Sequence, residues 1–177
     1  MRLKLGRPAL ARYADRFDVP PANGDGLAVT FLGVASLLID DGETAILTDG
    51  FFSRPALPRV LLGKIAPDHE RIDAVLARAG VERLAAVLPV HTHYDHAMDA
   101  AVVAERTGAD LVGGESTAYV GRGHGLPADR IRVAVPGEPM TYGGFTLTLI
   151  ESHHCPPDRF PGVITAPVVP PVRTAAY

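Results

Sequence analysis

A run of apolar residues at 84–90, LAAVLPV, leads directly into the segment HTHYDH at 91–96. A continuous apolar run of this length is typical of a β-strand that is buried on both faces. Three of the chain's seven histidines and one aspartate follow the run within six residues. Burying such a cluster without a ligand would leave several polar groups unsatisfied, and histidine with aspartate is a common set of metal ligands. The segment therefore predicts a metal site at the end of a buried strand.

The spacing inside this segment indicates how its side chains divide between ligand positions. His91 and His93 are two residues apart, so on an extended chain they point the same way and can bind one ion. Asp95 and His96 follow at the expected turn into a helix, offset from the first pair, and can bind a second ion. The end of the strand also lies at the carboxyl edge of the sheet, where α/β proteins place their ligand sites.

Hydrophobic periodicity predicts an α/β (α+β layered) domain, with hairpins first and then strands that alternate with helices. Asp41 and Gly42 mark a hairpin turn, and Gly80 and Gly108 mark the ends of helices. The segment 51–70 is too long for an ordinary connection, so we expect it to be functional or partly helical. The expected strands lie at 27–32, 36–40, 44–48, 84–90, 109–114, 130–135 and 145–152. The expected helices lie at 69–80, 97–108 and 115–123, and a turn is expected at 136–144.

Composition sets bounds on the setting and the partners of the chain. With 177 residues, 47% of them apolar, it is long enough for one domain with a real core. A formal net charge of −3 disfavours a nucleic-acid partner. The single cysteine excludes an internal disulfide and favours a cytoplasmic location, and no apolar run is long enough to span a membrane. We expect a basic N-terminal segment at 1–26, a domain at 27–157 and a proline-rich segment, read as loop or linker, at 158–177.

The segment HTHYDH matches the HxHxDH signature, and through it the chain resembles the metallo-β-lactamase-fold superfamily of metallo-hydrolases. The sequence VTFLGVASLLIDDGETAILTDGFF at 29–52 is similar to the N-terminal hairpins of that superfamily, which end in an aspartate, here Asp49. The sequence IESHHCPP at 150–157 stands where the superfamily has its third metal-binding histidine. The resemblance covers most of 27–157 and implies an αββα sandwich.

The resemblance also implies a role for each matching residue. His91, His93 and His154 would hold a first metal ion, with His153 as the alternative to His154. Asp95 and His96 would hold a second ion, and Asp95 would also act in catalysis by orienting the attacking water or taking its proton. Asp49 would accept hydrogen bonds that fix the loop. The implied cofactors are two divalent metal ions, zinc in the first place, with iron or manganese as alternatives.

These roles imply a metal-dependent hydrolase that acts with metal-activated water on a small-molecule ester, lactone or phosphodiester. After Cys155 the chain has one aspartate, Asp158, and no histidine, whereas the superfamily takes further ligands from its second half. The expectation is therefore a chain that resembles the first two-thirds of such an enzyme, and the alternative function is a truncated, catalytically incomplete metal-binding fragment. A sheet without its partners has unpaired edges, which predicts a homo-oligomer or aggregation.

Two neighbouring features carry weaker predictions. Phe51 and Phe52 follow Asp49 and are expected in the core, while Arg54 is a candidate for contact with an anionic group. The glycine-rich sequence GRGHG at 121–125 lacks the strand and the lysine of a phosphate-binding loop, so we do not assign it to phosphate.

Overall fold

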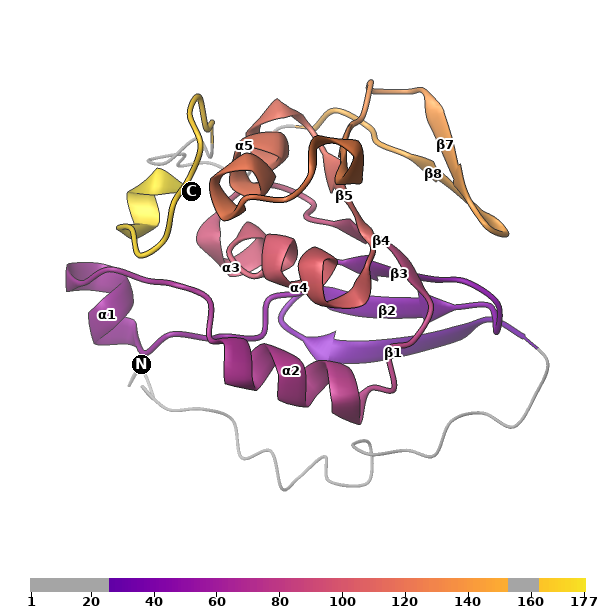
Figure 1. Ribbon diagram of the computed structural model, residues 1–177, viewed down its shortest axis with the longest axis horizontal. Coiled ribbons are helices and arrows are strands. Elements are labelled where there is room, and N and C mark those ends of the chain that lie inside the picture. The colour runs from indigo at the N-terminus through magenta and orange to yellow at the C-terminus, as the bar shows by residue number, and fades with distance from the viewer. Residues whose placement is uncertain (1–25, 153–162) are drawn as a thin grey trace, which may run out of the picture.

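The computed structural model describes residues 26–152 and 163–177, which fold into a sheet with helices on one face (Figure 1). The strands are β1 (Ala28–Gly33), β2 (Ser36–Asp40), β3 (Ala45–Thr48), β4 (Leu84–Leu88), β5 (Asp110–Gly113), β6 (Ile131–Val133), β7 (Pro139–Tyr142) and β8 (Phe145–Thr148). The helices are α1 (Leu57–Leu62), α2 (His69–Arg78), α3 (Tyr94–Ala97), α4 (Ala100–Thr107) and α5 (Glu115–His124), with short 3-10 turns η2 (Ala128–Arg130) and η3 (Thr174–Ala176). None of the helices that the structure describes is long and apolar enough to cross a membrane.

The main sheet has six strands in the order β1-β2-β3-β4-β5-β6. The first three strands pair antiparallel, and β3 to β6 pair parallel. The β2–β3 turn is the predicted hairpin, in which the Asp41 carboxylate accepts from the backbone N–H groups of Glu43 (2.9 Å) and Thr44 (2.7 Å). Because β3 and β4 are parallel neighbours, the segments that leave their carboxyl ends emerge side by side.

The two faces of this sheet bury different sets of residues, because successive side chains on a strand point to opposite faces. Leu47, Val87 and Leu111 belong to the cluster that includes the buried residues of α2, α4 and α5. Their chain neighbours Ile46, Ala86 and Val112 face the other way, where apolar residues of β7 and β8 pack on them. The layered α/β prediction is confirmed, with helices on one face of the sheet and a two-stranded layer on the other.

Most of the elements expected from the sequence form close to their expected bounds, and two expectations were wrong. The turn expected at 136–144 contains strand β7, which pairs antiparallel with β8 because Met140 and Tyr142 have an apolar sheet face to cover. The single helix expected at 97–108 is divided into α3 and α4, with the break at residues 98–99. The long segment 51–70 is partly helical, as expected, because it contains α1.

Residues 163–177 pack closely on the helices and on the segment before α2. Val172 forms an antiparallel bridge with Ile65, and the Thr174 hydroxyl donates to the Val60 carbonyl (3.3 Å). Three residues of this segment are buried in the main core: Ile164, Val168 and Tyr177. The close approach depends on α5, where a Cβ at Gly123 would overlap the backbone carbonyl of Val168. The glycine-rich sequence 121–125, which we did not assign to phosphate binding, therefore allows residues 163–177 to pack closely on α5.

Gly123→Ala should test this packing. Alanine normally stabilises a helix interior by up to about 1 kcal/mol relative to glycine, but here the added methyl meets backbone atoms, and overpacking of this kind costs about 1–3 kcal/mol. Urea unfolding followed by circular dichroism should therefore show a less stable variant, and limited proteolysis should cut residues 163–177 faster. Gly121→Ala is the matched control, since its new methyl would meet the flexible end of Leu111 at 2.9 Å. A Gly123→Ala variant as stable as the parent would contradict the packing.

Candidate metal centre

The motif lies where the sequence placed it, at the carboxyl end of β4, beside the end of β3. Thr48 of β3 is aligned with Leu88 of β4, and the Asp49 N–H donates to the Leu88 carbonyl (3.0 Å). The chain then turns away from each strand, and the motif runs into the short helix α3, which carries Asp95 and His96. The parallel pairing of two strands therefore fixes Asp49 next to the start of the motif.

Asp49 is fully buried and uses both carboxylate oxygens on the motif. Oδ1 accepts from the backbone N–H of Val90 (2.8 Å), and Oδ2 lies 2.9 Å from Nδ1 of His96. A carboxylate can only accept here, so Nδ1 of His96 carries the hydrogen. The Asp49 backbone has φ 56°, in the left-handed region that L-residues seldom occupy. Such a conformation at a buried carboxylate is typical of a functional position.

His96 is oriented by this bond, and its other ring nitrogen faces a different neighbour. Nε2 lies 4.0 Å from a carboxylate oxygen of Asp95. Burial lowers the pKa of His96, but the hydrogen bond and charge of Asp49, with the charge of Asp95, outweigh that effect and raise the pKa overall. The arrangement is the one that metal-binding histidines use, in which a carboxylate fixes one ring nitrogen and the other is directed to the ion.

His91 and His93 are brought together, as their spacing predicted. Nε2 of His91 lies 3.1 Å from Nδ1 of His93, and the His91 ring also lies against the His96 ring with centroids 3.9 Å apart. Two nitrogens bound to one tetrahedral zinc at about 2.0–2.1 Å are separated by about 3.3 Å. The two nitrogens thus already stand close to the separation that a shared ion would impose.

The described ranges 26–152 and 163–177 contain no group of three or more histidine, cysteine, aspartate or glutamate side chains set to hold one ion. The expected third histidine, His154 or its alternative His153, lies outside these ranges, as do Cys155 and Asp158. The donor chemistry of the residues present fits a divalent metal ion, because it combines facing imidazoles, a carboxylate-oriented imidazole and a neighbouring carboxylate. The assignment of individual ligands stays a prediction.

Sequence reasoning missed a second buried carboxylate, Asp99, which anchors the segment after β3. Its Oδ2 accepts from the backbone N–H groups of Phe52 (2.7 Å) and Ser53 (2.6 Å), and its Oδ1 accepts from the Ser53 hydroxyl (2.6 Å). The Ser53 hydroxyl oxygen in turn accepts from the Asp68 N–H (2.6 Å). One aspartate in an apolar helical pattern gives no signal of such a role, because its partners lie 46 and 47 residues away in the sequence.

The residues that follow Asp49 divide as expected between core and surface. Phe51 and Phe52 are buried, and the Phe51 ring meets Tyr94 of the motif edge-on at 6.0 Å between centroids. Arg54 is exposed and donates from its guanidinium to the Leu32 carbonyl (2.8 Å). Phe51 therefore packs against the motif, while Arg54 bonds back to the first strand.

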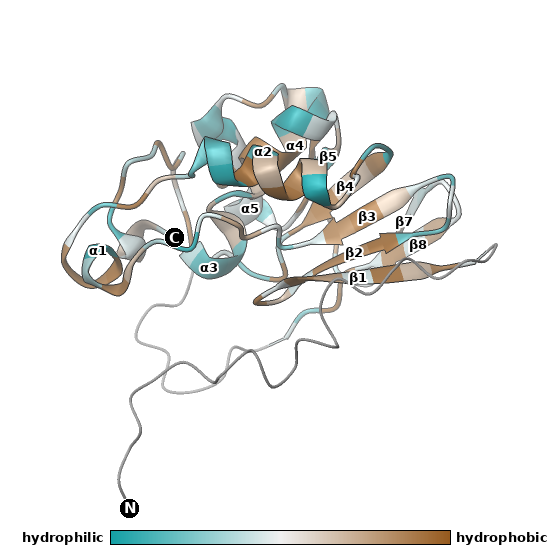
Figure 2. Ribbon diagram, turned by 90° about the horizontal axis from the view of Figure 1, so that it is seen from below, coloured by the Kyte–Doolittle hydropathy of each residue, from teal (hydrophilic) through white to brown (hydrophobic). Residues whose placement is uncertain are grey.

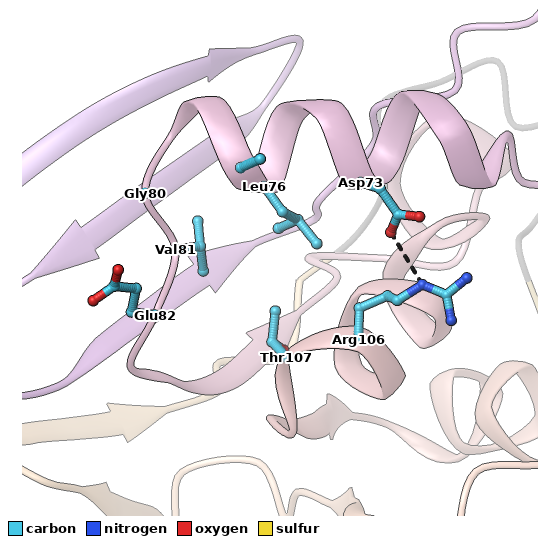
Figure 3. A pocket seen from close by; sticks show the side chains of 8 residues that line it. Asp73, Leu76, Gly80, Val81, Glu82, Arg106 and Thr107 are labelled. Atoms are coloured by element: carbon cyan, nitrogen blue, oxygen red, sulfur yellow. Dashed lines mark hydrogen bonds and ion pairs between the residues drawn. The ribbon is translucent and has the colours of Figure 1, made fainter.

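A hollow beside α2 and α4 lies away from the motif. It measures about 380 Å³ and lies between the end of α2, the loop after it and the end of α4 (Figure 3). Arg106 and Asp73 form an ion pair at its wall (3.0 Å), and no residue of the motif lines it. A single exposed ion pair offers neither a nucleophile nor a metal-ligand set, so this hollow is not a candidate catalytic site.

The geometry around Asp49 and the motif agrees with a comparison of sequences. The profile of the metallo-beta-lactamase superfamily matches residues 29–170. The chain belongs to this superfamily. The resemblance inferred from the HxHxDH motif and the N-terminal hairpins is therefore confirmed.

Curated relatives within the superfamily share part of their length with this chain. A UPF0173 metal-dependent hydrolase of Rhizobium etli is 29% identical over 129 residues, which are 72% of this chain and 48% of that protein. Another UPF0173 metal-dependent hydrolase, of Heliobacterium modesticaldum, is 31% identical over 86 residues, which are 49% of this chain and 29% of that protein. The chain therefore spans about half or less of the length of these relatives.

Solved structures with a similar fold include two metallo-hydrolases. Igni18, from Ignicoccus hospitalis, aligns with a TM-score of 0.47 and 18% identity, over 72% of this chain and 49% of that one. BJP-1, a subclass B3 metallo-beta-lactamase of Bradyrhizobium japonicum, aligns with a TM-score of 0.47 and 24% identity, over 78% of this chain and 53% of that one.

Asp49→Asn should weaken zinc binding about 10–100-fold, the usual effect of losing a carboxylate that orients a metal-binding histidine. Asparagine can still accept from Val90, but its amide would then donate toward Nδ1 of His96 and move the ring hydrogen to Nε2. Isothermal titration with zinc measures the effect. Asp99→Asn is the matched control, since Asp99 is equally buried and bonds Phe52 and Ser53 instead of a histidine. Equal losses in the two variants would contradict the role of Asp49.

Asp99 should also give the chain a pH-dependent stability. Burial raises the pKa of its carboxyl above that of an ordinary aspartate, although hydrogen bonds from Ser53 and Phe52 act in the opposite direction. The folded state therefore binds its proton more tightly than the unfolded state does, and the ionised form costs stability above the raised pKa. As the pH is lowered from about 7 to about 4.5, the free energy of unfolding of the parent should rise relative to that of Asp99→Asn. A difference between parent and variant that does not change with pH, measured by urea unfolding, would refute this.

Proposed function

We propose that this chain is the metal-binding part of a metal-dependent hydrolase. The observation that carries the proposal is the bond from Asp49 to Nδ1 of His96, combined with the 3.1 Å approach of the His91 and His93 nitrogens. In a metal site, a fully buried carboxylate that bonds one histidine of a closely packed group of three orients the free ring nitrogen toward the ion. Packing alone would not require it, because an apolar residue of similar size is often as stable as a buried polar pair.

The proposed ligands follow the spacing of the motif. His91 and His93, with His154 or His153, would hold the first ion, and Asp95 and His96 would hold the second. When bound, the metal lowers the pKa of its water and polarises the substrate oxygen that is to be attacked. Asp95 would orient the attacking water or take its proton, and Asp49 would hold the ring of His96 by its Nδ1 so that Nε2 faces the ion.

The proposed reaction is hydrolysis of a small-molecule ester, lactone or phosphodiester. The relatives from Rhizobium etli and Heliobacterium modesticaldum are described as metal-dependent hydrolases, which supports the reaction class. Zinc is the first candidate metal, because imidazole with carboxylate oxygen suits it, and iron or manganese are the alternatives. A net charge of −3 supports a substrate other than nucleic acid.

The alternative is a metal-binding fragment that does not turn over substrate. One observation supports it: the chain covers 48% of the relative from Rhizobium etli and 29% of the relative from Heliobacterium modesticaldum. The exposed edge of the main sheet also supports the expected self-association. Strand β1 lies at the edge of the main sheet with Leu27, Val29 and Phe31 exposed, and an exposed apolar edge pairs readily with another chain.

Metal analysis and one substitution separate these functions. Purified protein should contain about two divalent ions per chain, and removal by a chelator should abolish hydrolysis of a phosphodiester, lactone or ester, with zinc or manganese restoring it. His93→Ala should remove the activity, because it deletes a ligand of the first ion. His124→Ala is the matched control, since His124 pairs with Glu105 at 3.1 Å outside the motif. Activity that survives in His93→Ala would remove the motif as the catalyst, and one ion or fewer without turnover would establish the alternative.

A further inference from the structure

Helix α1 presents leucines to solvent. Leu57, Leu61 and Leu62 are 67%, 69% and 82% exposed, and α1 has no buried residue at all. Both views place this helix at the end of the molecule that also holds α3 and the C-terminal residue, and Figure 2 colours much of it as apolar. Single exposed leucines are ordinary on protein surfaces, but three within six residues on one helix gather apolar side chains at one place on the surface.

The chain segment that carries α1 is basic. The segment 50–67 carries Arg54, Arg59 and Lys64 and has no aspartate or glutamate, in a chain whose net charge is −3. None of these three cations is ion-paired within the part of the chain that the structure describes. The next acidic residue, Asp68, accepts from the Arg71 N–H as the cap of α2.

The helix is held in place at both ends, so its exposure does not result from loose packing. Before it, the backbone of Ser53 is bonded to Asp99. After it, the fully buried Ile65 pairs through its backbone with Val172 (2.7 and 3.0 Å). The fold therefore projects a rigid helix with apolar tips and basic neighbours away from the core.

We propose that α1 docks the protein on an anionic lipid surface. The leucines would enter the boundary between headgroups and acyl chains, and Arg59 and Lys64 would meet the lipid phosphates. None of the residues of this surface belongs to the metal-binding motif, so the inference goes beyond the proposed hydrolase and does not depend on it.

A second copy of the chain fits this surface less well. A symmetric contact would bring Arg59 and Lys64 of one copy against the same cations of the other, which is repulsive. Three leucines on a helix of six residues also cannot supply the roughly 800 Å² per partner that a stable interface needs. A negatively charged bilayer can bury the leucines of α1 and attract the basic residues beside them.

Vesicle co-sedimentation tests the proposal on the full chain. The protein should bind vesicles that contain phosphatidylglycerol, bind neutral phosphatidylcholine vesicles much less, and be released by salt. Replacing the leucines (Leu57→Ser, Leu61→Ser and Leu62→Ser together) should weaken binding by at least about tenfold. Arg59→Glu with Lys64→Glu should weaken it by at least about 25-fold, since each cation contributes about fivefold.

The matched control lies on the edge strand. Leu27→Ser with Phe31→Ser removes apolar side chains that are 64% and 63% exposed, and should leave vesicle binding unchanged. Circular dichroism checks that each variant folds, and the charge variant keeps the test decisive if the leucine variant does not. Absence of binding by the parent, equal binding to neutral vesicles, or full binding by both α1 variants would overturn the proposal. Light scattering that shows a dimer lost only in the α1 variants, without vesicle binding, would assign the surface to a second copy.

Discussion

The buried carboxylate of Asp49 is the constraint on which the rest of the site depends. A fully buried charge is stable only when its oxygens are occupied, and here one oxygen holds the backbone at Val90 and the other holds His96. Both bonds require the parallel alignment of Thr48 with Leu88, which brings the ends of β3 and β4 together. A shift of one residue between these strands would turn Asp49 away and leave the motif without its support.

The two buried carboxylates of this region perform opposite tasks. Asp49 raises the pKa of His96, so it stabilises positive charge in the motif. Asp99 accepts only from neutral donors of Phe52 and Ser53, and burial raises its own pKa. The first therefore sets the protonation of a candidate ligand, and the second fixes the course of the backbone after β3.

The sequence could predict what depends on local pattern. The buried strand within 84–90, the hairpin at Asp41 and the i, i+2 pair of His91 and His93 all follow from periodicity and turn chemistry; the structure has each of them, with the strand at Leu84–Leu88 and Val90 exposed. Strand β7 was missed because Pro139 and the glycines after Tyr142 read as a turn, whereas the apolar face of Ala86 and Val112 decides its conformation. The role of Asp99 could not be read either, because both of its partners are distant in sequence.

The segment after β3 connects the buried support of the metal-binding motif to the exposed helix α1. It begins with Asp49, which is buried, and continues into α1, which is exposed and lies in a basic segment of the chain. The bonds of Ser53 to Asp99 and Asp68 stand between them and fix the backbone at that point. Because this anchor isolates Asp49 from the helix, the leucines and cations of α1 can vary without disturbing the bond that orients His96. A chain built this way can change the surface it docks on while keeping the residues that would hold its metal.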